Sequence, residues 1–219
     1  MAPTIHPISL GISVSFLVAG EAGLTLVDGG LPGTEARIWS GMEALGYRPA
    51  DMRPIVLTHG HLDHGGCMPA LVAGSGARLA AHALAPAGLQ KSSRMLPPAR
   101  RPWGRAMRAF FGLARRWFPA PPSLQVDLPV EDGTRLDEWG LPATVLYTPG
   151  HTADSITLLL EDGTAFVGDL LVGRRGRAYP QPYFIEDEEA LLASVERLRQ
   201  VQPGAVYASH YRHPLEPAR

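Results

Sequence analysis

The chain has 219 residues, a mass of 23.5 kDa and a net charge of −1, and 45% of its residues are hydrophobic, which fits one globular domain. A single cysteine, Cys67, excludes an internal disulfide, and no apolar run is long enough to span a membrane. Because residues 1–20 have no positively charged region ahead of their apolar stretch, we expect no secretory signal and a cytoplasmic location.

Short apolar runs separated by turn residues predict strands at residues 5–10, 14–19 and 24–27. A helix is expected over 34–45, followed by short strands at 55–57 and 78–81. The second half predicts strands at 144–146, 155–160, 165–167 and 205–208, with a hairpin turn at Asp162-Gly163 and an amphipathic helix over 191–201. Strands with interposed helices indicate one mixed α/β domain, over 1–219, in which helices cover sheets.

Four candidate metal ligands occur in one run, Thr58-His59-Gly60-His61-Leu62-Asp63-His64, directly after the predicted strand at 55–57. In an extended segment residues i and i+2 point the same way, so His59 and His61 can bind one ion. Asp63 and His64 come a turn later and point elsewhere, which suits a second ion. Imidazole and carboxylate groups are the ligands of zinc-type cations, so this run predicts a metal site.

Three further candidates each follow a later predicted strand. His151 lies in Thr148-Pro149-Gly150-His151-Thr152, Asp169 follows Gly168, and His210 follows Ser209. Strand ends that meet at one edge of a sandwich form a pocket. Five of the eight histidines belong to this set of seven residues, which looks like the ligand set of a two-metal hydrolase.

These segments, with Val27-Asp28-Gly29-Gly30, resemble the five ordered motifs of the metallo-β-lactamase superfamily, in its glyoxalase II and lactonase branch, over positions 28 to 210. The resemblance implies a four-layer αββα sandwich with the site at one edge of two sheets. It implies a first metal ion on His59, His61 and His151. It implies a second on Asp63, His64 and His210. Asp169 would bridge the two ions, and Asp28 would support the ligand loops without binding metal.

The predicted cofactors are two divalent ions, zinc in the first place, with iron or manganese as alternatives. Two cations about 3.5–4 Å apart lower the pKa of a shared water and polarise a carbonyl or phosphoryl oxygen. We therefore expect a binuclear hydrolase of a small ester, lactone or thioester, with a metal-bridging hydroxide as nucleophile. Asp63 and Asp169 are its predicted catalytic residues, because Asp63 can orient the hydroxide or shuttle its proton.

Two alternatives stay open. One is a mononuclear iron oxidoreductase that resembles persulfide dioxygenases and would use His59, His151 and Asp169. The other is a phosphodiesterase of the same fold.

Antibiotic hydrolysis is not expected, since many β-lactamases of this fold carry cysteine where this chain has Asp169. Lactonases of the fold place a tyrosine soon after the bridging aspartate. Here Leu170-Leu171-Val172 follows, so a lactonase would need Tyr179 or Tyr183 as donor.

An insert at about 88–122 differs from the rest of the chain in charge. Eight basic residues lie between Lys91 and Arg116, and no acidic residue occurs from His64 to Val126. The remaining chain has 12 basic against 21 acidic residues, about −9. The insert predicts an amphipathic helix with arginines on one side and apolar residues on the opposite side. The apolar residues are Trp103, Met107, Phe110, Phe111, Ala114, Trp117 and Phe118.

The insert has three interpretations. In the first, it is a structural cap whose aromatic face packs on the domain. In the second, it is a lid or dimer contact that lines an acyl-binding pocket. In the third, it is a helix at a membrane surface. In the second, Trp103, Phe110 and Trp117 would contact substrate together with Tyr179 and Tyr183. The expected partner is a small-molecule substrate. Nucleic acid is not expected, because one short basic stretch gives no extended channel, and a homodimer remains an alternative.

Overall fold

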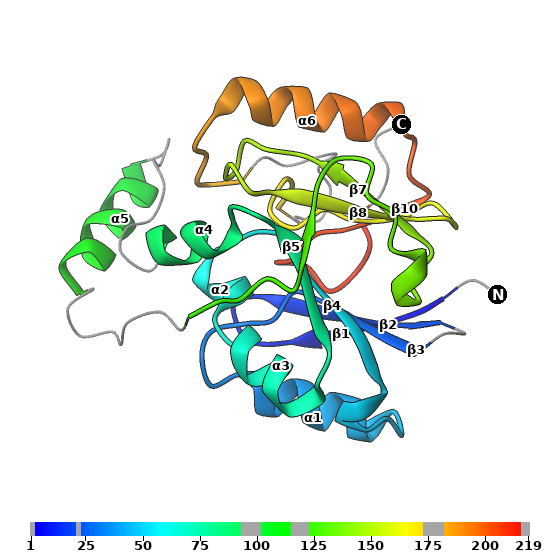
Figure 1. Cartoon of the computed structure of the whole chain (residues 1–219). Helices are drawn as coiled ribbons and strands as arrows, with labels where there is room; N and C mark the ends of the chain where they lie inside the picture. The colour runs from blue at the N-terminus through cyan, green and yellow to red at the C-terminus, as the bar shows by residue number, and fades with distance from the viewer. Residues whose placement is uncertain (1–2, 21–22, 93–101, 115–122, 173–181, 216–219) are drawn as a thin grey trace.

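Two β-sheets packed face to face, with helices on both outer sides, make a four-layer αββα sandwich (Figure 1). The computed structural model describes residues 3–20, 23–92, 102–114, 123–172 and 182–215. Figure 1 shows α1 (Glu35–Ala44) and α3 (Met68–Ser75) below the first sheet and α6 (Glu188–Gln200) above the second. The predicted mixed α/β sandwich is therefore confirmed.

The first sheet has six strands in the order β1-β2-β3-β4-β5-β6. Strands β1 (Thr4–Ser9), β2 (Val14–Gly20) and β3 (Gly23–Val27) are antiparallel neighbours. The next three run parallel to β3 and are β4 (Met52–Leu57), β5 (Arg78–His82) and β6 (Leu128–Val130). Parallel neighbours need crossover connections, and the helices α1 and α3 of two of these connections lie on the outer face of the sheet (Figure 1).

The second sheet has four strands in the order β10-β9-β8-β7. Strands β7 (Ala143–Tyr147), β8 (Ile156–Leu160) and β9 (Thr164–Phe166) form an antiparallel meander, and the predicted Asp162-Gly163 hairpin turn joins the last two, with Gly163 at φ +85°. Helix α6 then returns the chain, so β10 (Ala205–Tyr207) pairs parallel with β9. Asp187 caps α6, since its side chain accepts a hydrogen bond from Ala190 N.

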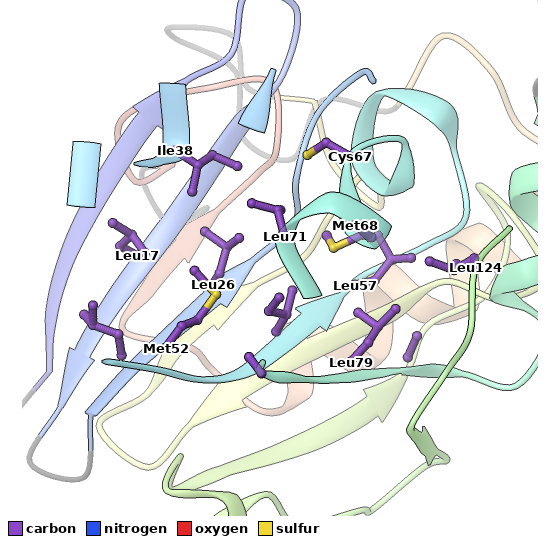
Figure 2. Packing of buried hydrophobic residues seen from close by; sticks show 14 of the residues in the cluster. Leu17, Leu26, Ile38, Met52, Leu57, Cys67, Met68, Leu71, Leu79 and Leu124 are labelled. Atoms are coloured by element: carbon purple, nitrogen blue, oxygen red, sulfur yellow. The ribbon is translucent and has the colours of Figure 1, made fainter. Parts of the chain in front are cut away.

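Three buried clusters correspond to the three interfaces between the four layers. Alternation along the strands sends Leu17 and Leu26 toward α1 and α3 (Figure 2), and sends Phe16 and Val27 toward the second sheet. Phe16 meets Phe166 of β9 there, with ring centroids 5.3 Å apart. The third cluster joins the second sheet to the apolar side of α6. Burial on both faces makes the two sheets a rigid frame for the loops at their edge.

Several short elements were not predicted. They are the 3₁₀ turns η1 (Pro49–Asp51) and η3 (Asp137–Trp139), α2 (Leu62–Gly65), α3, β6 and α4 (Ala85–Ser92). In the insert, α5 (Pro102–Ala114) coincides with the expected amphipathic helix, whose predicted end at Trp117 and Phe118 is outside the described residues. Figure 1 shows α5 beyond α4, to one side of the sandwich.

Among the described residues, no helix is long and apolar enough to cross a membrane.

Candidate metal centre

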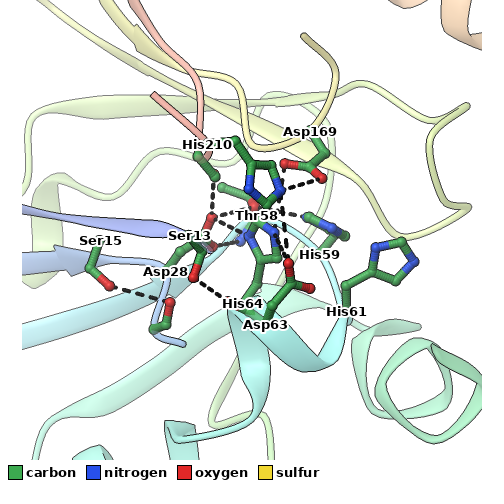
Figure 3. A network of polar contacts seen from close by, with 12 residues as sticks. Ser13, Ser15, Asp28, Thr58, His59, His61, Asp63, His64, Asp169 and His210 are labelled. Carbon is green, nitrogen blue, oxygen red and sulfur yellow. Dashed lines mark hydrogen bonds and ion pairs between the residues drawn. The ribbon is translucent and has the colours of Figure 1, made fainter. Parts of the chain in front are cut away.

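The candidate ligands meet at one edge of the sandwich, beyond the carboxyl ends of strands from both sheets. His59 and His61 follow β4, and α2 carries Asp63 and His64. The second sheet supplies His151 after β7, Asp169 after β9 and His210 after β10. Because β3 and β4 are parallel, as are β9 and β10, these strands present their carboxyl ends together. The fold thus brings all seven predicted residues into one place, and Figure 3 labels six of them, all except His151.

Within this place the side chains form two groups. Each residue offers one ligand atom, and in each group these atoms lie within 4.8 Å of one another. The first group is His59, His61, His151 and Asp169, all buried; the second is Asp63, His64 and His210. Asp169 joins them, since its Oδ2 lies 3.5 Å from His151 Nε2 and 3.1 Å from His210 Nε2. The resemblance implies the same two sets of histidines, with Asp169 as a bridge between two ions.

Buried atoms without hydrogen-bond partners provide a test of whether the groups fit metal ions. In the part of the chain that the structure describes, these atoms are His59 Nε2, His64 Nε2 and Asp169 Oδ1, besides one oxygen of Glu35. A buried polar atom without a partner is costly, so each one needs an explanation. A cation in each group would be bound by these atoms, with Asp169 between them. The residues therefore fit two divalent ions.

The histidine rings are oriented by contacts at their other nitrogen. Nδ1 of His151 donates to the Phe184 carbonyl at 2.8 Å, and Nδ1 of His210 donates to the Ile12 carbonyl at 2.5 Å. Nδ1 of His64 donates to Asp28 Oδ2 at 2.9 Å. Such bonds fix the tautomer and leave Nε2 as the metal-binding atom. The carbonyls of Phe184 and Ile12 were not predicted as partners, because every residue has a backbone carbonyl and the residue type therefore does not indicate this role.

The electrostatic surroundings of the two groups differ. Burial lowers the pKa of His59, His61 and His151, so the first group presents neutral imidazoles, the form that binds a metal ion. Burial also opposes protonation of His64, but the carboxylates of Asp63, Asp169 and Asp28 outweigh it and raise its pKa to about 9. Asp169 raises the pKa of His210 to about 10 despite partial burial. The carboxylates therefore favour positive charge in the second group.

Asp28 is the centre of the hydrogen bonds beneath the ligands (Figure 3). Its fully buried carboxylate accepts from Thr58 N and Thr58 Oγ1 at 2.8 Å, from Ser209 Oγ at 2.8 Å and from His64. Its φ of +59° is a left-handed conformation that aspartate tolerates better than most residues. Asp28 thus links three ligand-bearing segments without belonging to either group, in agreement with the supporting role that the resemblance implies.

Replacing Asp28 should weaken both groups at once. Asp28→Ala leaves the buried N–H of Thr58 and two hydroxyls without their acceptor, which should cost the metal-free protein about 2–3 kcal/mol of unfolding free energy. Asp28→Asn retains an acceptor oxygen and the left-handed conformation, so it should lose less. Urea unfolding of the two variants checks this, and equal stability of wild type and Asp28→Ala would refute the role.

The predicted substrate-contact residues are only partly described. Phe110 and Leu113 on α5 are each 65% exposed, so these two apolar side chains are largely open to solvent. Tyr183 is 45% exposed and precedes Phe184, whose carbonyl holds His151. The side chain of Trp103 and the whole of Trp117 and Tyr179 lie outside the described residues.

Two curated relatives cover most of this chain. The Probable metallo-hydrolase YflN of Bacillus subtilis (strain 168) is 28% identical over an aligned length of 214 residues, and the match covers 84% of this chain and 74% of that protein. The Beta-lactamase-like protein 2 homolog of Drosophila melanogaster is 25% identical over 77% of this chain, but the match spans only 48% of that protein.

Solved structures share the fold along nearly the whole chain. A metallo-β-lactamase of Cronobacter sakazakii with a HARLDQ motif has a TM-score of 0.68 and 25% identity, and the match covers 96% of this chain and 78% of that chain. TTHA1623, solved in a di-iron-bound form, has a TM-score of 0.67 and 26% identity over 94% of this chain and 92% of that chain. The family model described as the metallo-beta-lactamase superfamily matches residues 8–210, and the chain belongs to this superfamily.

Proposed function

We infer that the protein is a binuclear metal-dependent hydrolase of a small ester, lactone or thioester. The observation that carries this proposal is the pair of ligand groups joined by Asp169, with orphaned buried atoms in both. Zinc is the proposed metal, because three imidazoles and a carboxylate are typical zinc ligands. The names of the relatives, a metallo-hydrolase and a protein with two irons, support a metal-dependent activity in the same fold.

Two bound divalent ions would supply an activated water and polarise the carbonyl oxygen of the substrate. The chain's residues would contribute position and charge. Asp169 would hold the two sets of imidazoles in register, and Asp28 would fix the loops behind them. The Asp63 side chain is 23% exposed, unlike the buried first group, so it can receive a proton and pass it to solvent. No serine or cysteine nucleophile is needed, and the buried Cys67 is unsuited to that role.

Two features near the site support the proposed substrate class. Tyr183 is 45% exposed and directly precedes Phe184, whose carbonyl holds His151, so we propose its hydroxyl as the donor to a leaving group. The insert begins with α4, which packs against the ligand helix α2, and continues into α5 with its exposed apolar side chains. We therefore include an acyl chain among the features that the protein would recognise. Small molecules, rather than nucleic acid, are the proposed partners.

The proposal is tested by hydrolysis rates of zinc-loaded protein on a matched panel. The panel holds acyl lactones of several chain lengths, a glutathione thioester, an aryl ester and an aryl phosphodiester. We expect turnover of at least one carbonyl substrate and a preference among the chain lengths. Turnover of the phosphodiester alone would replace the proposal with a phosphodiesterase. Negligible rates on the whole panel would favour the iron oxidoreductase that uses His59, His151 and Asp169.

The contribution of the insert can be measured separately from the metal site. Replacing both Phe110 and Leu113 with serine should reduce the ratio of long-chain to short-chain rates by about 10-fold or more, the scale of a methylene-sized contact in an apolar pocket. Metal content should not change. Leu192→Ser on α6, where Leu192 is 50% exposed, is the matched control. An unchanged ratio would show that these side chains do not contact substrate. A large fall in the stability of the variant, measured by urea unfolding, would favour the structural-cap interpretation.

A further inference from the structure

Asp154 is a buried carboxylate beneath the first ligand group and is not one of its ligands. It is 2% exposed, and its Oδ2 accepts a hydrogen bond from the backbone N of Gly60 at 2.5 Å. On its other side it lies against α4, where a Cβ added to Gly88 would be 3.0 Å from both carboxylate oxygens. The carboxylate therefore lies between α4 and the loop that carries His59 and His61. A side chain larger than that of glycine at position 88 would crowd it.

This contact fixes the peptide between two ligands of the first group. Gly60 separates His59 from His61, and a Cβ on Gly60 would lie 2.6 Å from Leu89 N of α4. The Gly60 backbone is thus pressed against the helix on one side and bonded to Asp154 through its N–H. A rotation of this peptide would turn both neighbouring rings, so Asp154 controls the approach of the two imidazoles.

The second group has a different anchor, in the turn between β1 and β2. Ser13 is 1% exposed, and its Oγ donates to the carbonyl of Asp63 at 2.7 Å (Figure 3). The neighbouring Ile12 carbonyl accepts from the ring of His210. Val14 N also donates to Ser209 O at 2.7 Å, so the turn is tied to the segment that carries His210. Residues 12–14 therefore hold Asp63 and His210, both in the second group.

We propose that the two metal pockets have separate backbone anchors, with Asp154 as the positioning residue of the first pocket and Ser13 as that of the second. The proposal rests on the two-metal function inferred above. It differs from the role of Asp28, whose contacts reach the segments of both pockets. Neither Asp154 nor Ser13 touches a candidate ligand side chain in the described contacts, so each would act through the backbone.

The test measures zinc affinity one pocket at a time, by competition with a chromophoric chelator. His151→Ala removes a ligand of the first pocket and leaves the second intact; His210→Ala does the reverse. In the His210→Ala background, Asp154→Ala should weaken zinc binding by about 10- to 100-fold, as loss of a contact behind a ligand does. Asp154→Asn keeps an acceptor for Gly60 N and should recover affinity to within about 3-fold.

Ser13→Ala is the reciprocal variant and should weaken zinc by about 10-fold in the His151→Ala background only. Selective loss in one pocket separates positioning from general destabilisation, which would lower both affinities together. Equal weakening in both backgrounds, or no weakening in either, would overturn the proposal of separate anchors. Wild-type protein that binds fewer than two zinc ions would instead contradict the underlying two-metal function.

Discussion

Asp169→Ala should lose at least one of the two metal ions and nearly all turnover. The residue is 7% exposed, and its carboxylate lies close to histidines of both groups. Oδ1 lies 3.6 Å from His64 Nε2, and Oδ2 lies 3.5 Å from His151 Nε2. Burial would favour the protonated carboxyl, but His210 and His64 keep the pKa of Asp169 well below its usual value. Removing this charge leaves imidazoles facing each other without a shared anion.

The expected fall in turnover is at least about 100-fold, the lower end of the cost of removing one preorganised charge-stabilising group. Metal analysis of the purified variant gives the second readout. Asp137→Ala is the control, because Asp137 is an exposed carboxylate that pairs with Arg135 on the surface; it should retain both ions and full turnover. An Asp169→Ala protein that still bound two ions would contradict the bridging role.

Gly150→Ala should be the most destabilising single methyl addition in the ligand loops. Gly150 precedes His151 and has φ +132°, a conformation that side chains rarely adopt. A Cβ there would run into the Leu191 backbone of α6 and would lie 2.6 Å from Leu191 Cβ. Because this neighbour is helix backbone, the loop and α6 must separate. Strain and overpacking together should lower the free energy of unfolding by about 3 kcal/mol or more.

The glycine Gly46 provides a matched control for this prediction. Its φ is +81°, but a Cβ there would meet nothing within 4 Å, so Gly46→Ala carries only the conformational cost, about 1 kcal/mol. Urea unfolding of both variants in metal-free form isolates the contact with α6. Similar losses in the two variants would show that α6 can move away freely, and that the His151 loop is not held by it.

The candidate ligand residues could be recognised in the sequence because they follow simple local rules. His59 and His61 alternate at the end of a strand, and the strand itself is marked by the buried run Ile55-Val56-Leu57. The motifs around His151, Asp169 and His210 each follow a strand whose apolar pattern is clear. The fold class followed from the same runs. Strand ends and ligand types were therefore visible without any knowledge of tertiary contacts.

The unpredicted elements lack such a local pattern. Helices α3 and α4 have only eight residues each and are rich in alanine, glycine and proline, which makes their helical pattern hard to recognise. Strand β6 is three residues long and contains Pro129. The Phe184 carbonyl behind His151 is a backbone atom 33 residues away.

Asp154 shows the same limit for a side chain. It is visible in the sequence as an acidic residue after the His151 motif, but its partner Gly60 lies 94 residues earlier in the chain. Only tertiary structure brings such pairs together.

The measurement that tests the central claim most directly is the metal content of the purified protein, taken together with its reaction. Elemental analysis and a parallel assay for hydrolysis and oxygen uptake can use the same sample. The two ligand groups predict two divalent ions per chain, hydrolysis of a carbonyl substrate and no oxygen consumption. One iron per chain with oxygen consumption would contradict the binuclear hydrolase and establish the oxidoreductase alternative.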